Sequence, residues 1–125
     1  MKTLHDHETN PANESIRIEA DDPSHANASH QYRAFAQDGA CLGNIEFQQG
    51  PISVSGPDGN VVGVNGLTNE VLFAILIDRM RGFQSGQYAC RENALMLTHL
   101  EEALHWAHAR TRARQARGVE GTHAV

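Results

Sequence analysis

The chain has 125 residues and a formal net charge of −5, which limits it to one small domain with tails. The charge is unevenly distributed: residues 1–78 hold three basic and eleven acidic residues, whereas residues 79–125 hold seven Arg and four Glu. Nine of the ten basic residues are Arg, whose planar fork of donors suits phosphate groups. An acidic chain with one Arg-rich end favours a discrete anionic ligand over a nucleic-acid polymer.

Cysteine usage and hydropathy exclude several other classes of protein. Cys41 and Cys90 lie far apart without a CxxC motif, so neither a disulfide framework nor a zinc knuckle is indicated. The N-terminus lacks the apolar segment of a signal peptide. The longest apolar run, residues 71–77, is too short to span a bilayer. We therefore expect a protein of a reducing cytosol with no membrane partner.

Residues 1–38 are rich in His, Asn, Ser, Asp and Glu and show almost no apolar periodicity. This composition predicts a disordered or loosely attached extension. Four His residues could chelate a metal there, but solvated tail residues without a role are the favoured interpretation. These residues are His5, His7, His25 and His30.

Residues 39–66 carry the alternation that is typical of strands. Apolar residues alternate at Ile45 and Phe47 and again at Ile52 and Val54, and VVGV follows a turn sequence at residues 56–60. The pattern predicts an antiparallel β-meander of about three strands, closed by residues 65–66. Such a sheet is marginal by itself and must pack against another element.

Residues 67–117 predict two helices. Thr68 is a suitable N-cap for the first helix, and Gly86 suits the position after its end. The apolar face expected for this helix comprises Leu72, Ile75, Leu76, Met80 and Phe83.

A second, longer helix is expected from Tyr88 or Cys90 to just before Gly118, because no Pro or Gly interrupts it. Its stripe comprises Leu97, Leu100, Leu104 and Ala107. Asn93 extends this stripe by one turn and needs a partner. The fold class is therefore α+β: a small N-terminal antiparallel β-meander, then a long αα-hairpin that dimerises through its helices. Residues 118–125 form a Gly-containing C-terminal tail.

The spacing of candidate ligand residues indicates a site shared by two chains. Phe83, Gln84, Arg91 and Asn93 gather at the hairpin turn. Arg110, Arg112 and Arg114 lie 17 to 21 residues beyond Asn93, about 25–30 Å along the helix. An antiparallel second chain would bring its Arg residues to the first chain's turn. Burial against that chain would also enlarge a small core. We therefore expect a homodimer with two equivalent composite sites.

Each candidate also has a plainer interpretation. Arg110 and Arg114 could clamp a diphosphate, or they could be a solvated helix end. Phe83 could stack on a purine, although packing in the core beside Met80 is the favoured interpretation from the residues alone. Trp106 fits packing in a dimer or against a sheet.

Catalytic and metal-binding motifs are weak by comparison. Glu102 and His105 form one E-x-x-H motif, whereas di-metal bundles need two, so no metal is expected. No nucleophile motif or cofactor-binding loop is present, so we expect neither catalytic residues nor a cofactor.

The segments RGFQSG, ACRENAL, LEEALHW, RTRAR and GVEGTH together resemble the phage Thoeris anti-defence proteins of the first type. The resemblance covers about residues 44–125 and includes IEFQQGPI. This family shares a helical-hairpin domain with phage anti-CBASS sponges. Its members bind cyclic ADP-ribose isomers made by TIR-domain defence enzymes and hold them uncleaved. Some also bind cyclic di- or trinucleotides, and their assemblies are dimers or trimers of dimers.

The resemblance implies a role for each candidate residue. Phe83 would stack on adenine, Asn93 would make a polar contact at the hairpin, and Arg110 and Arg114 of the partner chain would clamp phosphate and ribose. It implies a non-enzymatic sponge in the cytoplasm of an infected or lysogenic bacterial host. A helical adaptor protein and a cyclic-nucleotide-cleaving enzyme are the alternatives. The full set of implied ligand residues is Phe83, Gln84, Arg91, Asn93, Arg110, Arg114, Thr122 and His123.

Overall fold

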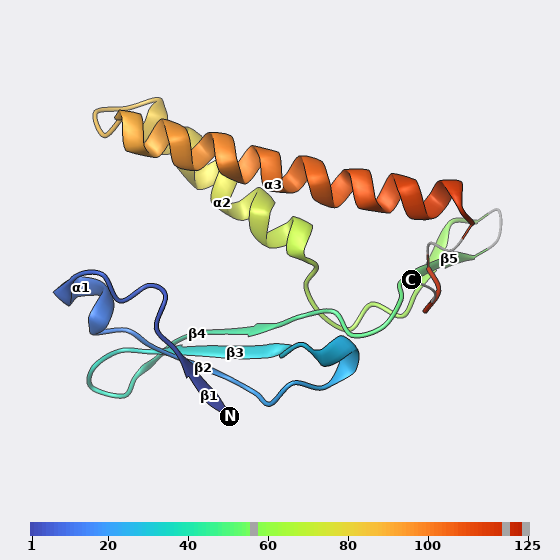
Figure 1. Cartoon of the computed structure of the whole chain (residues 1–125), viewed down its shortest axis with the longest axis horizontal. Coiled ribbons are helices and arrows are strands. Elements are labelled where there is room, and N and C mark those ends of the chain that lie inside the picture. The colour runs from blue at the N-terminus through green and yellow to red at the C-terminus, as the bar shows by residue number, and fades with distance from the viewer. Residues whose placement is uncertain (56–57, 119–120, 124–125) are drawn as a thin grey trace. The chain divides into compact units, whose positions relative to one another are not determined.

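A computed structural model of the chain describes residues 1–55, 58–118 and 121–123 (Figure 1). The C-terminal tail expected at 118–125 is therefore described only in part. The chain forms two compact units: Met1–Gly50 with Val64–Gly66, and Pro51–Gly63 with Leu67–Val125. We call them the sheet unit and the hairpin unit and describe each by itself. The chain passes between them after Gly50, after Gly63 and after Gly66.

The sheet unit is built on a four-stranded antiparallel sheet in the order β1-β2-β3-β4. A β-bulge at Ala34 and Phe35 interrupts the pairing of β3 with β4. A short helix α1 and a 3-10 turn η1 lie in the connections. The elements are β1 (Lys2–Leu4), α1 (Pro11–Glu14), β2 (Arg17–Ala20), η1 (His25–Asn27), β3 (Gln31–Phe35) and β4 (Cys41–Glu46).

The small antiparallel meander before the helices is confirmed, but its strands begin much earlier than expected. Residues 1–38, predicted as a disordered or loosely attached extension, contribute β1, β2 and β3. The strands are three to five residues long, and Ala20 is the buried hydrophobic residue among them. Backbone hydrogen bonds between the strands therefore hold this sheet more than buried side chains do. Because few side chains are buried, the alternation of apolar and polar residues by which strands are predicted is weak here.

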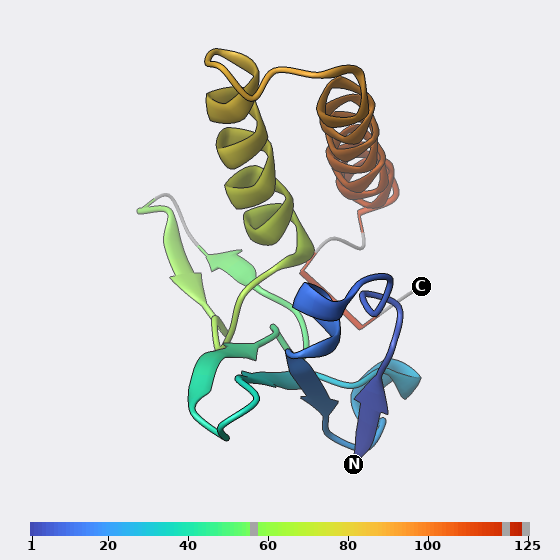
Figure 2. The ribbon, with the colours of Figure 1, turned by 90° about the vertical axis from the view of Figure 1, so that its left-hand side faces the viewer.

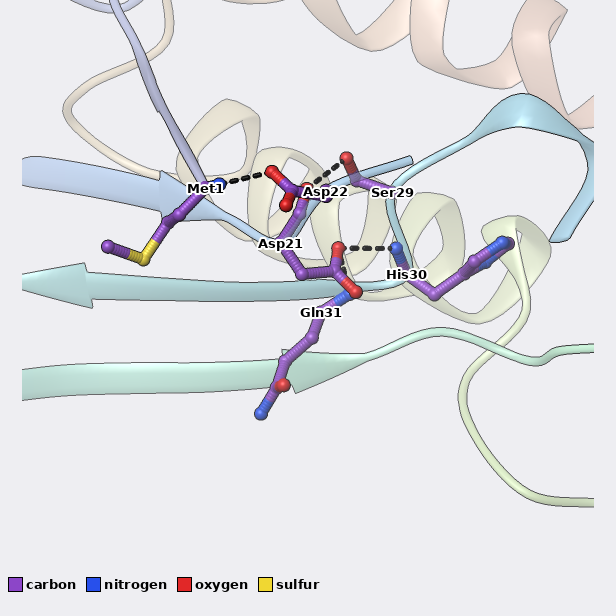
Figure 3. A network of polar contacts seen from close by, with 6 residues as sticks. All are labelled: Met1, Asp21, Asp22, Ser29, His30 and Gln31. Carbon is purple, nitrogen blue, oxygen red and sulfur yellow. Dashed lines mark hydrogen bonds and ion pairs between the residues drawn. The ribbon is translucent and has the colours of Figure 1, made fainter. Parts of the chain in front are cut away.

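A polar cluster fixes the connection between β2 and β3 (Figure 3). The Asp21 carboxylate accepts hydrogen bonds from the backbone N–H of His30 at 2.9 Å and of Gln31 at 3.2 Å. The Ser29 hydroxyl donates to the Asp21 carbonyl at 2.6 Å. The N–H of Gln31 lowers the pKa of Asp21 most, and that of His30 adds to the effect. Hydrogen bonds to the charged form thus stabilise the turn.

The strands predicted at residues 52–64 exist but pair differently from the expected meander. β5 (Ser53–Ser55) and β6 (Asn60–Val62) form a separate two-stranded sheet, while β4 pairs with β3. Residues 56 and 57 of the expected turn lie outside the described residues. Asn65 returns the chain to the sheet unit, because its side chain bonds the backbone N–H and carbonyl of Gln49 at 2.8 and 2.7 Å.

The first helix of the hairpin unit, α2 (Asn69–Gln84), begins as predicted. Thr68 is its N-cap, and its hydroxyl accepts from the Val71 N–H at 3.3 Å. The apolar face is narrower than expected: Ile77 and Met80 are buried, whereas Ile75 and Leu76 are 56% and 45% exposed. A helix that packs against one neighbour buries one stripe, so a broad apolar face leaves residues uncovered.

The second helix, α3 (Arg91–Ala116), packs against α2 to complete the predicted αα-hairpin (Figure 2). The expected stripe of Leu97, Leu100, Leu104 and Ala107 is half-buried. An ion pair of 2.8 Å between Arg81 and Glu101 links the helices. Of the helices described, none has the length and hydropathy needed to cross a bilayer.

Candidate ligand-binding site

The predicted ligand residues all belong to the hairpin unit, where they form two groups at opposite ends of α3. The turn group lies where α2 meets α3, and the tail group lies where α3 ends. Asn93 and Arg114 are 21 positions apart on one helix, which corresponds to about 30 Å. The turn group is Phe83, Gln84, Arg91 and Asn93; the tail group is Arg110, Arg114, Thr122 and His123.

Side-chain amides brace the backbone of the turn group. Gln84 donates from Nε2 to the Cys90 carbonyl at 3.2 Å, and its Oε1 accepts from the Cys90 N–H at 3.1 Å. Asn93 Nδ2 donates to the Tyr88 carbonyl at 3.1 Å, which is the partner its position on the stripe required. Cys90 caps α3, because its Sγ accepts from the Asn93 N–H at 3.4 Å. The loop between the helices is therefore held at both of its ends.

An aromatic pair and a cation gather beside this braced loop. The half-buried Phe83 ring meets the Tyr88 ring at 6.4 Å between centroids, with an interplanar angle of 84°. The Arg79 guanidinium lies 5.0 Å from the Phe83 centroid. Tyr88 is exposed. Aromatic faces and a guanidinium in this arrangement can stack on a planar base.

Sequence reasoning missed Arg79 and Tyr88. Arg79 could have been found, because it precedes Phe83 by four residues on one helix face.

The tail group is centred on Arg114, which is only 7% exposed. Its Nη2 donates to the Thr122 carbonyl at 3.1 Å. The neighbouring Gly121 carbonyl accepts from the Ser53 hydroxyl at 3.0 Å. Ser53 was also missed by sequence reasoning, since no local pattern joins residues 68 positions apart.

Arg110 and Arg114 lie one turn apart but have different surroundings. Arg110 and Arg91 are exposed, whereas Arg114 is buried. The plainer interpretation, a solvated helix end, therefore fits Arg110 but not Arg114. A buried arginine is unusual in proteins unless it is paired or hydrogen-bonded, and the contact with Thr122 meets part of that need.

Among the residues described, no group of three or more His, Cys, Asp and Glu could hold a metal ion. Glu102 lies 3.8 Å from His99. In the sheet unit His7 and His30 bond separate backbone carbonyls, each at 2.6 Å. That unit also has an open cavity of about 380 Å³ without any predicted ligand residue. Its lining residues are Asp21, His30, Gln31, Glu46, Phe47, Gln49 and Asn65.

Comparison with known proteins identifies relatives of this chain. A protein-family model described as the Acb2/Tad1 hairpin domain matches residues 44–112. The chain is also similar to Thoeris anti-defense 1 of Bacillus phage SBSphiJ7, with 46% identity over 82 residues. That match covers 66% of this chain and 53% of the phage protein, so the chain spans about half the length of this relative.

Proposed function

Because the chain belongs to the Acb2/Tad1 hairpin-domain family, we propose that it is a phage anti-defence protein. In this proposal it binds a cyclic nucleotide immune signal in the cytoplasm of an infected or lysogenic bacterial host and holds it without cleaving it. The signal would be a cyclic ADP-ribose isomer made by a TIR-domain enzyme, with cyclic di- or trinucleotides as a second class of ligand.

The observation that carries this proposal is the separation of two complementary groups along α3. The turn group offers aromatic faces, with Phe83 and Tyr88 in contact. The tail group offers guanidinium groups, with Arg110 exposed and Arg114 held by a carbonyl. A cyclic ADP-ribose isomer needs both, a stacking surface for its base and donors for its phosphates. Two antiparallel chains would bring the groups together in one site.

Exposed apolar side chains on the hairpin support a homodimer or a trimer of dimers. Trp106 on α3 is 64% exposed, and a large exposed aromatic residue is typical of an interface. Several further apolar residues on both helices are exposed in a single chain. These are Val71, Ile75, Leu76, Leu95 and Met96.

Sequestration also sets a requirement on affinity. To keep a signal below the threshold of its effector, a scavenger needs a Kd in the nanomolar range, about −12 kcal/mol. Charge-assisted bonds from two guanidinium groups and stacking on an adenine supply interactions of the strength required. Residues already held in place lose less conformational entropy on binding.

Recovery of the ligand after binding tests the proposal. The protein is incubated with cyclic ADP-ribose isomers, separated from free ligand and then denatured, and the released material is analysed by mass spectrometry. Intact ligand is the expected result. A cleaved product would indicate an enzyme, for which the exposed His105 or His108 would be the first general-base candidate. Absence of retained ligand would indicate an adaptor. Arg110→Ala serves as the control: because Arg110 is an exposed predicted ligand residue, this variant should retain less ligand than the unmodified chain.

A further inference from the structure

We propose that Ser53 on β5 is a positioning residue for the proposed binding site, because it holds the C-terminal segment against Arg114. We call this arrangement the tail clasp: Ser53 bonded to Gly121, Thr122 bonded to Arg114, and Gly121 in close approach to Ile52. The inference rests on the proposed function, since Arg114, Thr122 and His123 are the ligand residues that it organises.

Two hydrogen bonds hold the segment from two different elements. The Ser53 hydroxyl on β5 donates to the Gly121 carbonyl at 3.0 Å. Arg114 on α3 donates to the next carbonyl, that of Thr122, at 3.1 Å. The β5 strand, the end of α3 and the C-terminal segment thus meet in the hairpin unit (Figure 1). Gly121 and Thr122 are thus each held by a different element, although they follow α3.

Two separate features favour glycine at position 121. Its φ is +79°, in the left-handed region that residues with a Cβ rarely adopt. An added Cβ would also lie 3.2 Å from the Ile52 carbonyl oxygen and 3.5 Å from Ser53 Oγ. Gly118 has a similar φ of +73°, but no atom of the described residues lies within 4 Å of an added Cβ. A comparison of Ala substitutions at the two glycines therefore distinguishes the effect of the close approach to Ile52 from the effect of backbone strain alone.

The clasp explains why Arg114 is buried and oriented before any ligand arrives. A long side chain normally loses rotamer freedom when it binds, and this loss reduces affinity. Arg114 has already lost that freedom, because the Thr122 carbonyl and the surrounding chain hold it. Ser53 thus acts on the ligand through the tail segment and not by direct contact.

Two measurements on the full chain test the clasp, one without ligand and one with it. The first is amide hydrogen exchange of the C-terminal peptide. The second is calorimetric titration with cyclic ADP-ribose isomers and with inorganic pyrophosphate. Ser53→Ala should accelerate exchange and weaken ligand affinity about three- to ten-fold, the effect of one hydrogen bond. Ser53→Thr keeps the hydroxyl and suits a strand, so both values should return toward those of the unmodified chain.

The glycine variants provide the matched comparison. Gly121→Ala should weaken affinity several-fold more than Gly118→Ala, because both add strain but only the first pushes the segment away from Ile52. Equal losses for the two variants would overturn the role of the close approach.

The remaining outcomes distinguish the clasp from the proposed function. Unchanged exchange in Ser53→Ala would overturn the clasp whether or not any nucleotide binds. Faster exchange with unchanged affinity in Ser53→Ala would overturn the positioning role. Tighter binding by this variant would also overturn it, because the segment would then block access of the ligand to Arg114. Failure of the unmodified chain to bind any isomer would refute the proposed function, while the exchange result would still decide whether the clasp forms.

Discussion

Arg110 and Arg114 show how strongly the surroundings of a residue decide what its loss will do. Both occupy the last turns of α3, yet Arg110 is exposed and Arg114 is buried against the tail. An exposed side chain can be truncated with little effect on folding. A buried charged donor that is removed leaves its acceptor without a partner.

Arg114→Ala should lower the free energy of unfolding by about 1.5–3 kcal/mol, the range for a hydrogen bond to a charged group. Arg110→Ala should change it by less than about 0.5 kcal/mol. Both variants should weaken binding of the cyclic ADP-ribose isomer. Urea unfolding followed by circular dichroism measures the stability, and titration measures the affinity. Equal losses of stability would contradict the described burial of Arg114.

Asp21 should give the sheet unit a dependence on pH. Its pKa is lowered in the folded chain, mainly by the N–H of Gln31. The carboxylate therefore stabilises the fold at pH values above the unfolded-state pKa of about 3.8. This stabilisation is lost as the pH falls through the lowered folded-state value. Asp21→Asn should accelerate amide exchange in residues 17–35 at pH 7, and the difference from the unmodified chain should shrink below pH 3.8.

Asp6→Asn is the control for this measurement, because the Asp6 carboxylate is exposed and makes no hydrogen bond or ion pair among the residues described. An equal change in both variants would mean that net charge, and not the turn between β2 and β3, is responsible.

Ligand binding should not depend on a metal ion. The predicted ligand residues comprise amide, guanidinium, hydroxyl and aromatic groups together with one histidine, His123, which is a poor set for a divalent cation. Dialysis against a chelator should leave the affinity within about twofold. A loss that zinc or magnesium restores would be the contrary result.

At the scale of elements, the Gln84 side chain makes two of the hydrogen bonds that hold the turn between α2 and α3. Gln84 bonds both the N–H and the carbonyl of Cys90. Gln84→Ala should therefore destabilise the hairpin unit by about 1–3 kcal/mol, because two hydrogen bonds are lost. Gln84→Glu keeps the acceptor but not the donor, so its effect should be intermediate.

Gln87→Ala is the matched control, since this exposed glutamine lies in the same loop and its side chain makes no hydrogen bond among the residues described. Thermal unfolding followed by circular dichroism measures the effects. The assignment fails if Gln84→Ala and Gln87→Ala give the same midpoint.

The helices could be predicted from sequence because their signals are local. The Thr68 cap, the stripe on α3 and the end before Gly118 each depend on residues within a few turns. The strands β1 to β3 could not be predicted from sequence, because pairings such as Ala20 with Tyr32 depend on backbone contacts between short segments. The same limit applies to the site. Residues of the hairpin could be named, but Ser53 could not, since its partner lies at position 121.

At the scale of the whole molecule, the proposed composite site makes a prediction about mixed dimers. Light scattering should first show a dimer or a larger assembly at micromolar concentration. Phe83→Ala and Arg110→Ala should each weaken every site of a homodimer. When the two variants are mixed and exchange chains, each mixed dimer has one site with both lesions and one with neither. About half of the sites in mixed dimers should therefore regain full affinity.

The exposed position of Arg110 makes it the better partner in this experiment, because loss of Arg114 would also disturb the tail clasp. If Phe83 and Arg110 served the same site within one chain, every site of a mixed dimer would keep one lesion, and titration would show no recovery. A stable monomer that binds the ligand would also refute the composite site.

Because the chain crosses between its two units three times, the parts of the protein can fold only in a certain order during synthesis on the ribosome. The sheet unit needs nothing beyond Gly66, so it can close while α2 and α3 are still being made. β5 can pair with β6 early, but the tail clasp joins the Ser53 hydroxyl to Gly121, so this hydrogen bond must wait until residue 121 has emerged. At roughly 5–20 residues per second, the wait is on the order of several seconds. The valines of β5 and β6 are exposed even in the folded chain, so throughout this time they are open to chaperones or to other nascent chains.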